Sequence, residues 1–489
     1  MLGSGLLSAG GWSAGALPLG VRDGVWAQRG PALTVLGAAT AYAGLVLLVA
    51  AWWWLGQLLR DGSAVGPGGL RSVLWSWVVP LLPGPLLFST DAYSYLAQGV
   101  LAERGWDVYR LGPEVLGGPL ADSVPEMWRD TPAPYGPLAI VAMRAVVALT
   151  GEHHVVAGAL GMRLLALIGL GLIVWAVRRI AAGTGTSEDG ALWAAVLNPL
   201  VLVHLVGGAH NEALMLGLMT AGLLAFRRGR WVLGTAVLVS AALVKVPAAL
   251  ALCCAAAVSV ASAASAAGRP DGWPGRLRAA GIALVAAASL LLAVGASGLG
   301  WGWLRTLRTP AQVYTALSLS TDAGRLLGLL TDWLGMGTDT GVGAVAVARM
   351  AGMLLGLCAV AVCVRRAPRT GAEYATGLAL LALVVSAPVV QPWYLLWGTV
   401  PLAAVAWQLL ERTWVRLATV VLLFMVLPSG WEPSVAYVLA AVIGSSAAVA
   451  GLLAWAPPGA LCRVRGFAFL RAAARTRRSG SRAGSPPGG

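Results

Sequence analysis

The sequence predicts an all-α protein that crosses a membrane about thirteen times, and three observations support this fold class. The 489 residues are 58% hydrophobic and 11% charged, whereas soluble domains are nearer ~45–50% apolar and about 25% charged. Folded in water, such a chain would expose large apolar patches, which excludes a soluble enzyme; a disordered chain is excluded by the same composition. The apolar residues also gather in long runs, and most arginines fall between these runs.

A membrane-spanning helix needs roughly 20 mostly apolar residues. The candidate spans are 32–55, 73–88, 157–177, 190–206, 213–226, 231–244, 248–264, 279–298, 341–364, 374–390, 393–409, 415–429 and 434–455. A further apolar segment, 137–150, is short and contains Arg144, so we expect a surface or re-entrant helix there.

The placement of arginine and lysine predicts the orientation, because cytoplasmic loops are enriched in these residues. With 89–156 outside, 22 basic residues lie in inside segments and 10 in outside segments. We therefore expect an N-terminal segment 1–31, a multi-span domain 32–455 with 89–156 as its large first extracytoplasmic loop, and a basic tail 456–489. The tail is predicted to be disordered and cytoplasmic. The net charge of +14 is thus a topology signal and not evidence of nucleic acid binding.

The loop 89–156 holds eight of the 20 acidic residues, together with aromatic side chains that suit sugar binding. It begins with a predicted helix from Thr90 to about Arg104, whose apolar stripe would lie on the membrane. Asp91 stands at the start of this helix, at the exit of a span. A carboxylate there could serve as a general base, or it could only complement the positive end of the helix. The sequence alone leaves both interpretations open.

Two cationic residues lie near predicted span ends. Arg129 stands close to Tyr135 in a proline-rich stretch whose stiff backbone could hold both, or which is only a turn. Lys245 follows the predicted helix 231–244, which is about 21 Å long and so shorter than the ~30 Å hydrocarbon core. We expect Lys245 to lie below the outer surface, where it needs a partner such as a lipid phosphate, unless it snorkels to the interface.

Two predicted outside tips between spans carry the remaining polar candidates. They are His210, Asn211 and Glu212 in the first tip and Gln391, Trp393 and Tyr394 in the second. The first group suits sugar hydroxyls or, alternatively, one metal ion, and the second offers aromatic faces; water-facing tips or interfacial aromatics would give the same pattern. The sequence contains no nucleotide-binding loop and no Cys/His metal spacing, which favours a membrane-soluble sugar donor.

Taken in order, these segments resemble the membrane glycosyltransferases of the GT-C type. More narrowly, they resemble the polyprenol-phosphomannose-dependent α-1,6-mannosyltransferases of actinobacteria (MptA/MptB type), which extend lipomannan backbones. The resemblance covers roughly residues 73–410. The segments that carry it are Asp91-Ala92-Tyr93-Ser94-Tyr95, Gly117-Gly118-Pro119, Trp128 to Pro137, Gly208 to Glu212, Lys245-Val246-Pro247 and Gln391-Pro392-Trp393-Tyr394.

The resemblance implies an inverting transfer of mannose from a polyprenyl phosphate to a mannan or mannosylated lipid outside the cell, without a nucleotide or an essential metal cofactor. It implies Asp91 as the general base and Lys245, with Arg129, as the groups that hold the donor phosphate. The predicted sugar- and acceptor-binding residues are Tyr93, Tyr95, Tyr135, His210, Asn211, Glu212, Gln391, Trp393 and Tyr394. The expected partners are the lipid-linked donor, a glycan or glycolipid acceptor and the bilayer of the cell membrane.

Two alternatives remain open. A lipid or sugar transporter would carry ionisable residues deep in its spans and an internal repeat; here Arg163 and Arg349 stand out within spans, but we find no repeat and the acidic residues cluster outside. A GT-C enzyme that uses another lipid-linked sugar, such as arabinose or glucose, would present the same residues, because all sugars offer hydroxyls. A non-catalytic scaffold is the least consistent with the polar tips.

Overall fold

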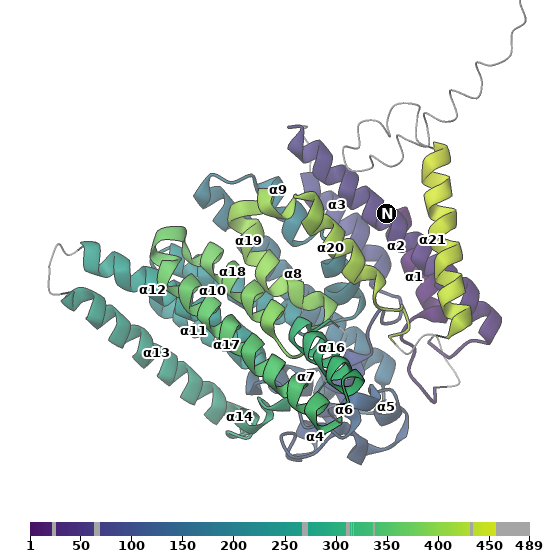
Figure 1. The fold of residues 1–489 in the computed structure, drawn as a ribbon, viewed down its shortest axis with the longest axis horizontal. Helices are drawn as coiled ribbons and strands as arrows, with labels where there is room; N and C mark the ends of the chain where they lie inside the picture. The colour runs from purple at the N-terminus through teal and green to yellow at the C-terminus, as the bar shows by residue number, and fades with distance from the viewer. Residues whose placement is uncertain are drawn as a thin grey trace, which may run out of the picture.

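The computed structural model describes residues 1–21, 26–62, 69–266, 272–309, 313, 315, 317–335, 338–430 and 434–455. Within these residues every regular element is a helix (Figure 1), which confirms the predicted all-α class. The predicted basic tail 456–489 lies outside the described residues.

The helices of the first half run from the N-terminus to the site described below. They are α1 (Leu2–Ala14), α2 (Pro31–Arg60), α3 (Gly69–Val78), η1 (Val79–Leu81), α4 (Asp91–Glu103), η2 (Pro113–Leu116), α5 (Gly118–Asp122), α6 (Glu126–Arg129), α7 (Pro137–Thr150), α8 (Val155–Thr184), α9 (Glu188–Ala195), the π-helix η3 (Val201–Gly207), α10 (Glu212–Arg227) and α11 (Trp231–Val244).

The second half continues the bundle. Its helices are η4 (Val246–Ala248), α12 (Ala249–Ala266), α13 (Trp273–Ser297), α14 (Trp303–Thr306), α16 (Leu319–Trp333), α17 (Thr338–Thr370), α18 (Ala372–Ser386), η5 (Pro392–Tyr394), α19 (Leu395–Leu410), α20 (Thr413–Phe424) and α21 (Val435–Trp455).

Seven helical segments of the described chain are long and apolar enough to cross a bilayer. They are Pro31–Arg60, Val155–Thr184, Val246–Ala266, Trp273–Ser297, Gly343–Thr370, Pro392–Leu410 and Val435–Ala454. The pair η3 and α10 passes the same test as one span bent by 111°, which would make eight. Three predicted spans form the shorter apolar helices α11, α18 and α20. The chain is thus a membrane protein, and the count of about thirteen crossings stays a prediction.

The predicted span 73–88 is wrong as a single helix. α3 and η1 end at Leu81, and the chain is not helical again until Asp91. Pro80, Pro83 and Pro85 explain the break, since each lacks the backbone N–H that an α-helix interior needs. The extended stretch that results leads directly into the helix that carries Asp91.

α1 is a helix that the sequence analysis did not identify, and it packs closely on α2. Glycines let the two backbones approach. A Cβ atom at Gly10 would lie 2.4 Å from the carbonyl oxygen of Gly37, and one at Gly44 would lie 2.5 Å from the amide nitrogen of Leu7. Small residues at a helix seam are typical of packing inside membranes. α1 therefore belongs to the bundle.

The segment 89–156 folds into α4, η2, α5, α6 and α7, which lie towards one end of the bundle (Figure 1). The bounds predicted for its first helix are confirmed, because α4 runs from Asp91 to Glu103. The predicted position on the membrane surface is wrong: Ala92 to Ala102 are all buried. α4 packs against α7 and α8 on both sides, so its apolar stripe faces protein. The segment 137–150 forms the short helix α7, tied to α4 by an ion pair between Arg144 and Glu103 at 2.8 Å.

Candidate active site

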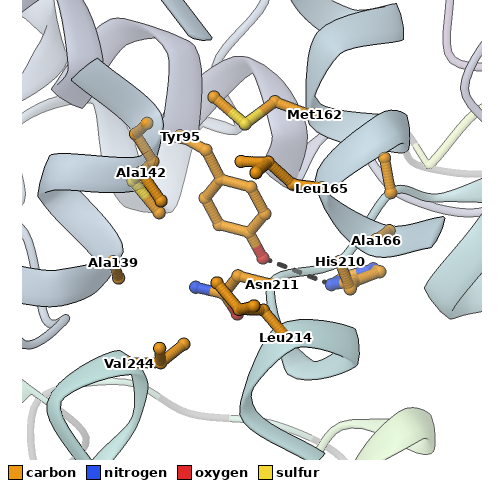
Figure 2. A pocket seen from close by; sticks show the side chains of 12 residues that line it. Tyr95, Ala139, Ala142, Met162, Leu165, Ala166, His210, Asn211, Leu214 and Val244 are labelled. Atoms are coloured by element: carbon orange, nitrogen blue, oxygen red, sulfur yellow. Dashed lines mark hydrogen bonds between the residues drawn. The ribbon is translucent and has the colours of Figure 1, made fainter. Parts of the chain in front are cut away.

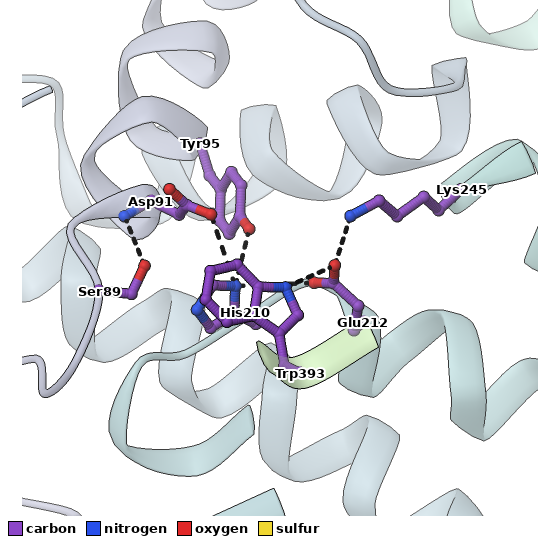
Figure 3. Close-up of polar contacts among 7 residues, drawn as sticks. All are labelled: Ser89, Asp91, Tyr95, His210, Glu212, Lys245 and Trp393. Carbon is purple, nitrogen blue, oxygen red and sulfur yellow. Dashed lines mark hydrogen bonds and ion pairs between the residues drawn. The ribbon is translucent and has the colours of Figure 1, made fainter. Parts of the chain in front are cut away.

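Polar side chains from five places in the chain meet next to the start of α4 (Figure 3). Asp91 begins α4, and His210 lies in the turn between η3 and α10. Glu212 begins α10, Lys245 follows α11, and Trp393 lies in η5. We call Asp91, His210, Glu212 and Lys245 the site cluster.

His210 lies between the two carboxylates of the site cluster. Its Nδ1 is 3.6 Å from Asp91 Oδ2 and 3.7 Å from Glu212 Oε2. The hydroxyl of Tyr95, one turn along α4, is 3.3 Å from the same nitrogen. The imidazole thus connects the start of α4 with the start of α10.

Glu212 connects this imidazole to the cation. Its Oε1 accepts a hydrogen bond from Lys245 in a direct ion pair, and another from the indole Nε1 of Trp393 at 3.0 Å. The Trp393 ring also lies on His210, with ring centroids 4.1 Å apart. One carboxylate therefore holds two side chains that are distant in the sequence, Lys245 and Trp393, next to His210.

Asp91 is more exposed to solvent than Glu212, the other carboxylate of the site cluster. Its side chain is 18% exposed, whereas that of Glu212 is fully buried. Its backbone N–H donates to Ser89 Oγ at 3.1 Å, while Thr90 makes no side-chain cap. The helix start is thus capped by Ser89, and the Asp91 carboxylate is left pointing towards His210 (Figure 3).

The surroundings of Asp91 change its proton affinity. Burial raises the pKa of this carboxyl, the negative charge of Glu212 raises it further, and Lys245 opposes the change, so that the pKa of Asp91 is about 7. A carboxylate with a pKa near neutrality is a better proton acceptor than an ordinary aspartate and still ionises at physiological pH.

Of the interpretations left open for His210, Asn211 and Glu212, the water-facing tip is wrong. His210 and Glu212 are fully buried, because η3 and α10 meet at a sharp bend of 111° that turns this segment into the bundle. Ala209 adopts a positive φ of 53° to make the turn. The ion pair with Lys245 offsets the cost of burying the Glu212 carboxylate.

Lys245 lies in an aromatic cage. Its Nζ is 4.8 Å from the ring centroid of Tyr394, 5.3 Å from that of Trp397 and 5.8 Å from that of Tyr135, distances at which a cation is attracted to the ring face. The partner predicted for this lysine was a lipid phosphate, and in the structure Glu212 pairs with it. An ammonium group has three N–H donors, so it can bind a further anion without leaving Glu212.

Three of the residues predicted from the sequence lie apart from these contacts. The hydroxyl of Tyr93 donates to the carbonyl of Ala16 at 2.7 Å, which ties α4 to the N-terminal segment. Arg129 donates to the carbonyls of Val124 and Asp122 at 3.1 and 2.8 Å. Gln391 directly precedes η5 and is partly buried. Tyr93 and Arg129 therefore donate to backbone carbonyls outside the site cluster in this structure.

Sequence reasoning missed His204 and Trp397. The ring of His204, buried in η3, lies 5.0 Å from that of Trp393 and 6.0 Å from that of His210. A histidine inside the apolar run 201–207 was the available signal for the first. Trp397, three residues after Tyr394, has the sequence pattern of an interfacial tryptophan at a span end, which gives no sign of its role beside Lys245.

A small cavity adjoins the site cluster between α7, α8 and α10 (Figure 2). Its volume of about 20 Å³ is room for about one water molecule. Tyr95, His210 and Asn211 supply its polar wall, and the rest is apolar. Within the described part of the chain neither amide atom of Asn211 has a hydrogen-bond partner. These atoms are therefore free to bind a polar ligand group beside His210.

The site's groups do not suggest a metal centre. Among the described residues, no group of three or more His, Cys, Asp or Glu side chains has a geometry that could hold a metal ion. The arrangement instead combines one carboxylate of raised pKa, one caged cation and aromatic faces, which suits proton transfer and the binding of an anionic or polar ligand.

Comparison with known proteins gives consistent similarities. Residues 1–264 match the family model described as α-(1→6)-mannopyranosyltransferase, N-terminal domain, and residues 320–455 match the MptB C-terminal domain. No solved structure shows significant similarity to the chain.

Three relatives illustrate the similarity. An α-(1→6)-mannopyranosyltransferase of Mycobacterium tuberculosis is 34% identical over 476 residues, which cover 86% of this chain and 80% of that protein. The α-(1→6)-mannopyranosyltransferase A of the same organism is 36% identical over 415 residues, covering 83% and 78%. The α-(1→6)-mannopyranosyltransferase B of Corynebacterium glutamicum is 32% identical over 480 residues, covering 91% and 78%.

Proposed function

The chain belongs to the α-(1→6)-mannopyranosyltransferase family, and on that premise we propose that it transfers mannose from a polyprenyl-phosphate carrier to a mannan-type acceptor, with inversion, on the extracytoplasmic face of the cell membrane. Membership makes the protein a membrane mannosyltransferase that takes a sugar donor and a glycan acceptor. The identity of the donor, the acceptor and the face of the membrane are the proposed parts.

The observation that carries the proposal is the site cluster itself. A carboxylate with a pKa of about 7 lies 3.6 Å from His210, and the same imidazole is 3.7 Å from a carboxylate that holds a caged lysine. Transfer from a phosphate donor needs these two functions side by side, a base for the acceptor hydroxyl and a cation for the leaving phosphate.

Asp91 acts as the general base. Its carboxylate takes the proton from the acceptor's 6-hydroxyl as that oxygen attacks the anomeric carbon of the mannose. The bond between this carbon and the phosphate oxygen breaks on the opposite face, and the polyprenyl phosphate leaves with the bonding electrons. Attack opposite the leaving group inverts the anomeric centre.

Lys245 receives the leaving phosphate. The ammonium keeps one N–H on Glu212 and directs the others to the phosphate oxygens, whose negative charge grows as the bond breaks. The caging rings of Tyr135, Tyr394 and Trp397 hold the cation without neutralising it. We leave Arg129 out of this step, because its guanidinium bonds to the carbonyls of Val124 and Asp122 and not to the site cluster.

The sugar is bound by the polar groups that surround His210. The water-sized cavity takes one sugar hydroxyl, to which Tyr95 and Asn211 offer a hydroxyl and an unpartnered amide, and Trp393 with Tyr394 supply aromatic faces for the ring. The extracytoplasmic location is supported by the distribution of arginine, which predicts the cluster end of the bundle to be outside.

The test is a donor panel assayed with the purified protein in lipid nanodiscs. Polyprenyl-phosphate mannose, the corresponding glucose and arabinose lipids, and GDP-mannose are offered with an α-1,6-mannan acceptor. We expect transfer from the mannose lipid alone, with an α-1,6 linkage by glycosidase mapping. Transfer from GDP-mannose, or a preference for another lipid-linked sugar, would refute the proposed donor.

A further inference from the structure

Arg163 is a buried cation that bonds only to backbone in its recorded contacts. It lies in the first third of α8 and is 2% exposed. Its guanidinium donates five hydrogen bonds, all to main-chain carbonyls of the described chain: Leu82 at 2.8 Å, Gly84 at 2.5 Å, Pro85 at 2.8 Å, Val206 at 3.1 Å and Gly207 at 3.0 Å.

These carbonyls belong to two segments that both lead into the site cluster. We call 82–90 the first arm, because it leads into Asp91. We call 206–211 the second arm, because it carries His210 and leads into Glu212. Arg163 bonds to the N-terminal end of each arm, the end farther along the chain from the site cluster. The arms also touch each other directly, since the N–H of Leu87 donates to the carbonyl of Gly207 at 3.1 Å.

Each arm contains a strained residue between Arg163 and the site. Among the described residues only Phe88 and Ala209 combine a side chain with a positive φ, at 59° and 53°. Phe88 lies between Pro85 and Asp91, and Ala209 lies between Gly207 and His210. A non-glycine residue in this conformation persists only where the surrounding structure holds it. Arg163 is the side chain that bonds to both arms at their ends.

The shape of the guanidinium matters here more than its charge. Arginine presents five N–H donors in a rigid planar fork, whereas lysine presents three from one point. A fork can span two backbone segments and fix their separation. One nitrogen of this fork, Nη2, already bonds to Pro85 in the first arm and Gly207 in the second, but an ammonium has only three N–H donors and cannot replace all five bonds.

We propose that Arg163 is a positioning residue of the transferase, which clamps the two strained arms in register so that Asp91 faces His210 and Glu212. The inference rests on the proposed function of the site cluster. Arg163 touches neither substrate in this view, and it acts through the backbone that carries the base. Lys245 follows a separate helix, α11, and lies outside both arms, so the clamp acts more directly on the base than on the cation.

The first test is kinetic. Arg163→Lys keeps the buried charge and breaks the fork. We expect the kcat of the folded enzyme to fall by about tenfold or more, because small misplacements of a base are costly, while the KM for the lipid donor stays within about threefold. Ala209→Gly, added to this variant, should raise kcat again by about threefold, because glycine takes a positive φ without strain.

Arg416→Lys is the matched control. Arg416 is also buried and also donates to a carbonyl, that of Trp53 at 3.3 Å, but it contacts neither arm in its recorded bonds. Its folded fraction should keep the kcat of the parent enzyme, and Ala209→Gly should not raise it. Equal losses of kcat in the two lysine variants, or no recovery with Ala209→Gly, would show a general role in folding and overturn the clamp.

Folding is scored by size-exclusion chromatography and thermal melting in detergent. If Arg163→Lys does not give folded protein, kcat is measured instead on the double variant Arg163→Lys with Ala209→Gly. A kcat of the double variant at or above the parent value would then refute the proposal.

A second measurement separates the clamp from the proposed chemistry. Hydrogen exchange by mass spectrometry should show faster exchange in peptides from both arms of Arg163→Lys, and unchanged exchange in α18. This result does not depend on whether Asp91 is the base. Full activity in Asp91→Asn would refute the proposed base and leave the clamp standing, whereas unchanged exchange in both arms would refute the clamp.

Discussion

Two ionic clusters in this molecule are built from carboxylates and cations beside aromatic rings and carry opposite balances of charge. The site cluster has two carboxylates, Asp91 and Glu212, for one cation, Lys245. The second ionic cluster joins α2 to the α19–α20 junction and consists of Arg60, Glu411 and Arg416. It has two cations for one carboxylate.

Aromatic rings surround the cation in both places. In the second ionic cluster Arg416 lies between the rings of Trp53 and Trp193, at 5.1 and 5.0 Å, and Trp193 in turn donates to the carbonyl of Trp52. The second ionic cluster has an excess positive charge, and both of its arginines also donate to backbone carbonyls. This cluster therefore holds helices together.

The excess charge of the site cluster is a carboxylate with no cation of its own. His210 is the only basic side chain of the described residues within ion-pair distance of Asp91. A spare carboxylate raised to a pKa of about 7 can accept a proton, whereas a spare guanidinium cannot. The difference teaches that the balance of charge, and not burial or aromatic packing, separates the chemical cluster from the structural one.

The largest predicted effect comes from removing one carboxylate from each of the two clusters. Asp91→Asn should reduce kcat by roughly 10²–10⁴-fold, the usual contribution of a positioned base, and leave the protein folded because Asn keeps the shape. Glu411→Gln should do the reverse: it removes the carboxylate from two arginines and lowers the melting temperature, while the folded enzyme keeps its kcat. Both are measured by transfer assay and thermal melting on nanodisc samples.

The comparison fails in a defined way. Near-normal turnover by Asp91→Asn would remove the base from the site cluster, and a loss of kcat in folded Glu411→Gln would show that the second ionic cluster also serves the reaction.

The next effect concerns the cation. Lys245→Met should lower kcat by roughly 10²–10³-fold, because a group that stabilises developing charge is removed. The same change leaves the Glu212 carboxylate buried without its partner, which by itself destabilises a protein. The double variant Lys245→Met with Glu212→Gln separates the two causes, since it removes both charges. It should recover thermal stability and not kcat; recovery of both would assign Lys245 a structural role only.

A smaller effect sharpens the comparison through pH. With Asp91 as base, kcat/KM rises with pH through about 7 and is lost below it, as the carboxyl becomes protonated. Glu212 raises the pKa of Asp91 and Lys245 lowers it. Glu212→Gln should therefore move the acidic limb of the profile to lower pH, and Lys245→Met should move the residual activity to higher pH. Shifts in the same direction for both variants would exclude Asp91 as the group that titrates.

The sequence predicted the parts of the site that depend on local structure. A short apolar stretch followed by Lys245 indicated a cation in need of a partner, which is 15% exposed and paired with Glu212, and a first-turn acid indicated the start of α4 at Asp91. Both follow from helix length and capping, which are properties of neighbouring residues.

Burial and partners depended on contacts between distant residues, and the sequence did not supply them. Glu212 pairs with Lys245, 33 residues away, and with Trp393, 181 residues away. A tip that lacks such partners would face water, an alternative that the sequence analysis left open. The five carbonyls bound by Arg163 carry no residue-type signal at all, because any residue has a carbonyl.

The smallest predicted effect distinguishes Trp393, which bonds to Glu212, from Trp397, which belongs to the aromatic cage of Lys245. Trp393→Phe keeps an aromatic ring on His210 and loses the hydrogen bond from Nε1 to Glu212, which is 3.0 Å long. We expect kcat/KM to fall by about fivefold, equivalent to about 1 kcal/mol for one hydrogen bond. Trp397→Phe is the matched control, since the Trp397 Nε1 has no hydrogen-bond partner among the described residues and its ring faces Lys245 at 5.3 Å. The control should lose less than Trp393→Phe in the same transfer assay. Equal losses would mean that ring packing, and not the bond to Glu212, accounts for the contribution of Trp393.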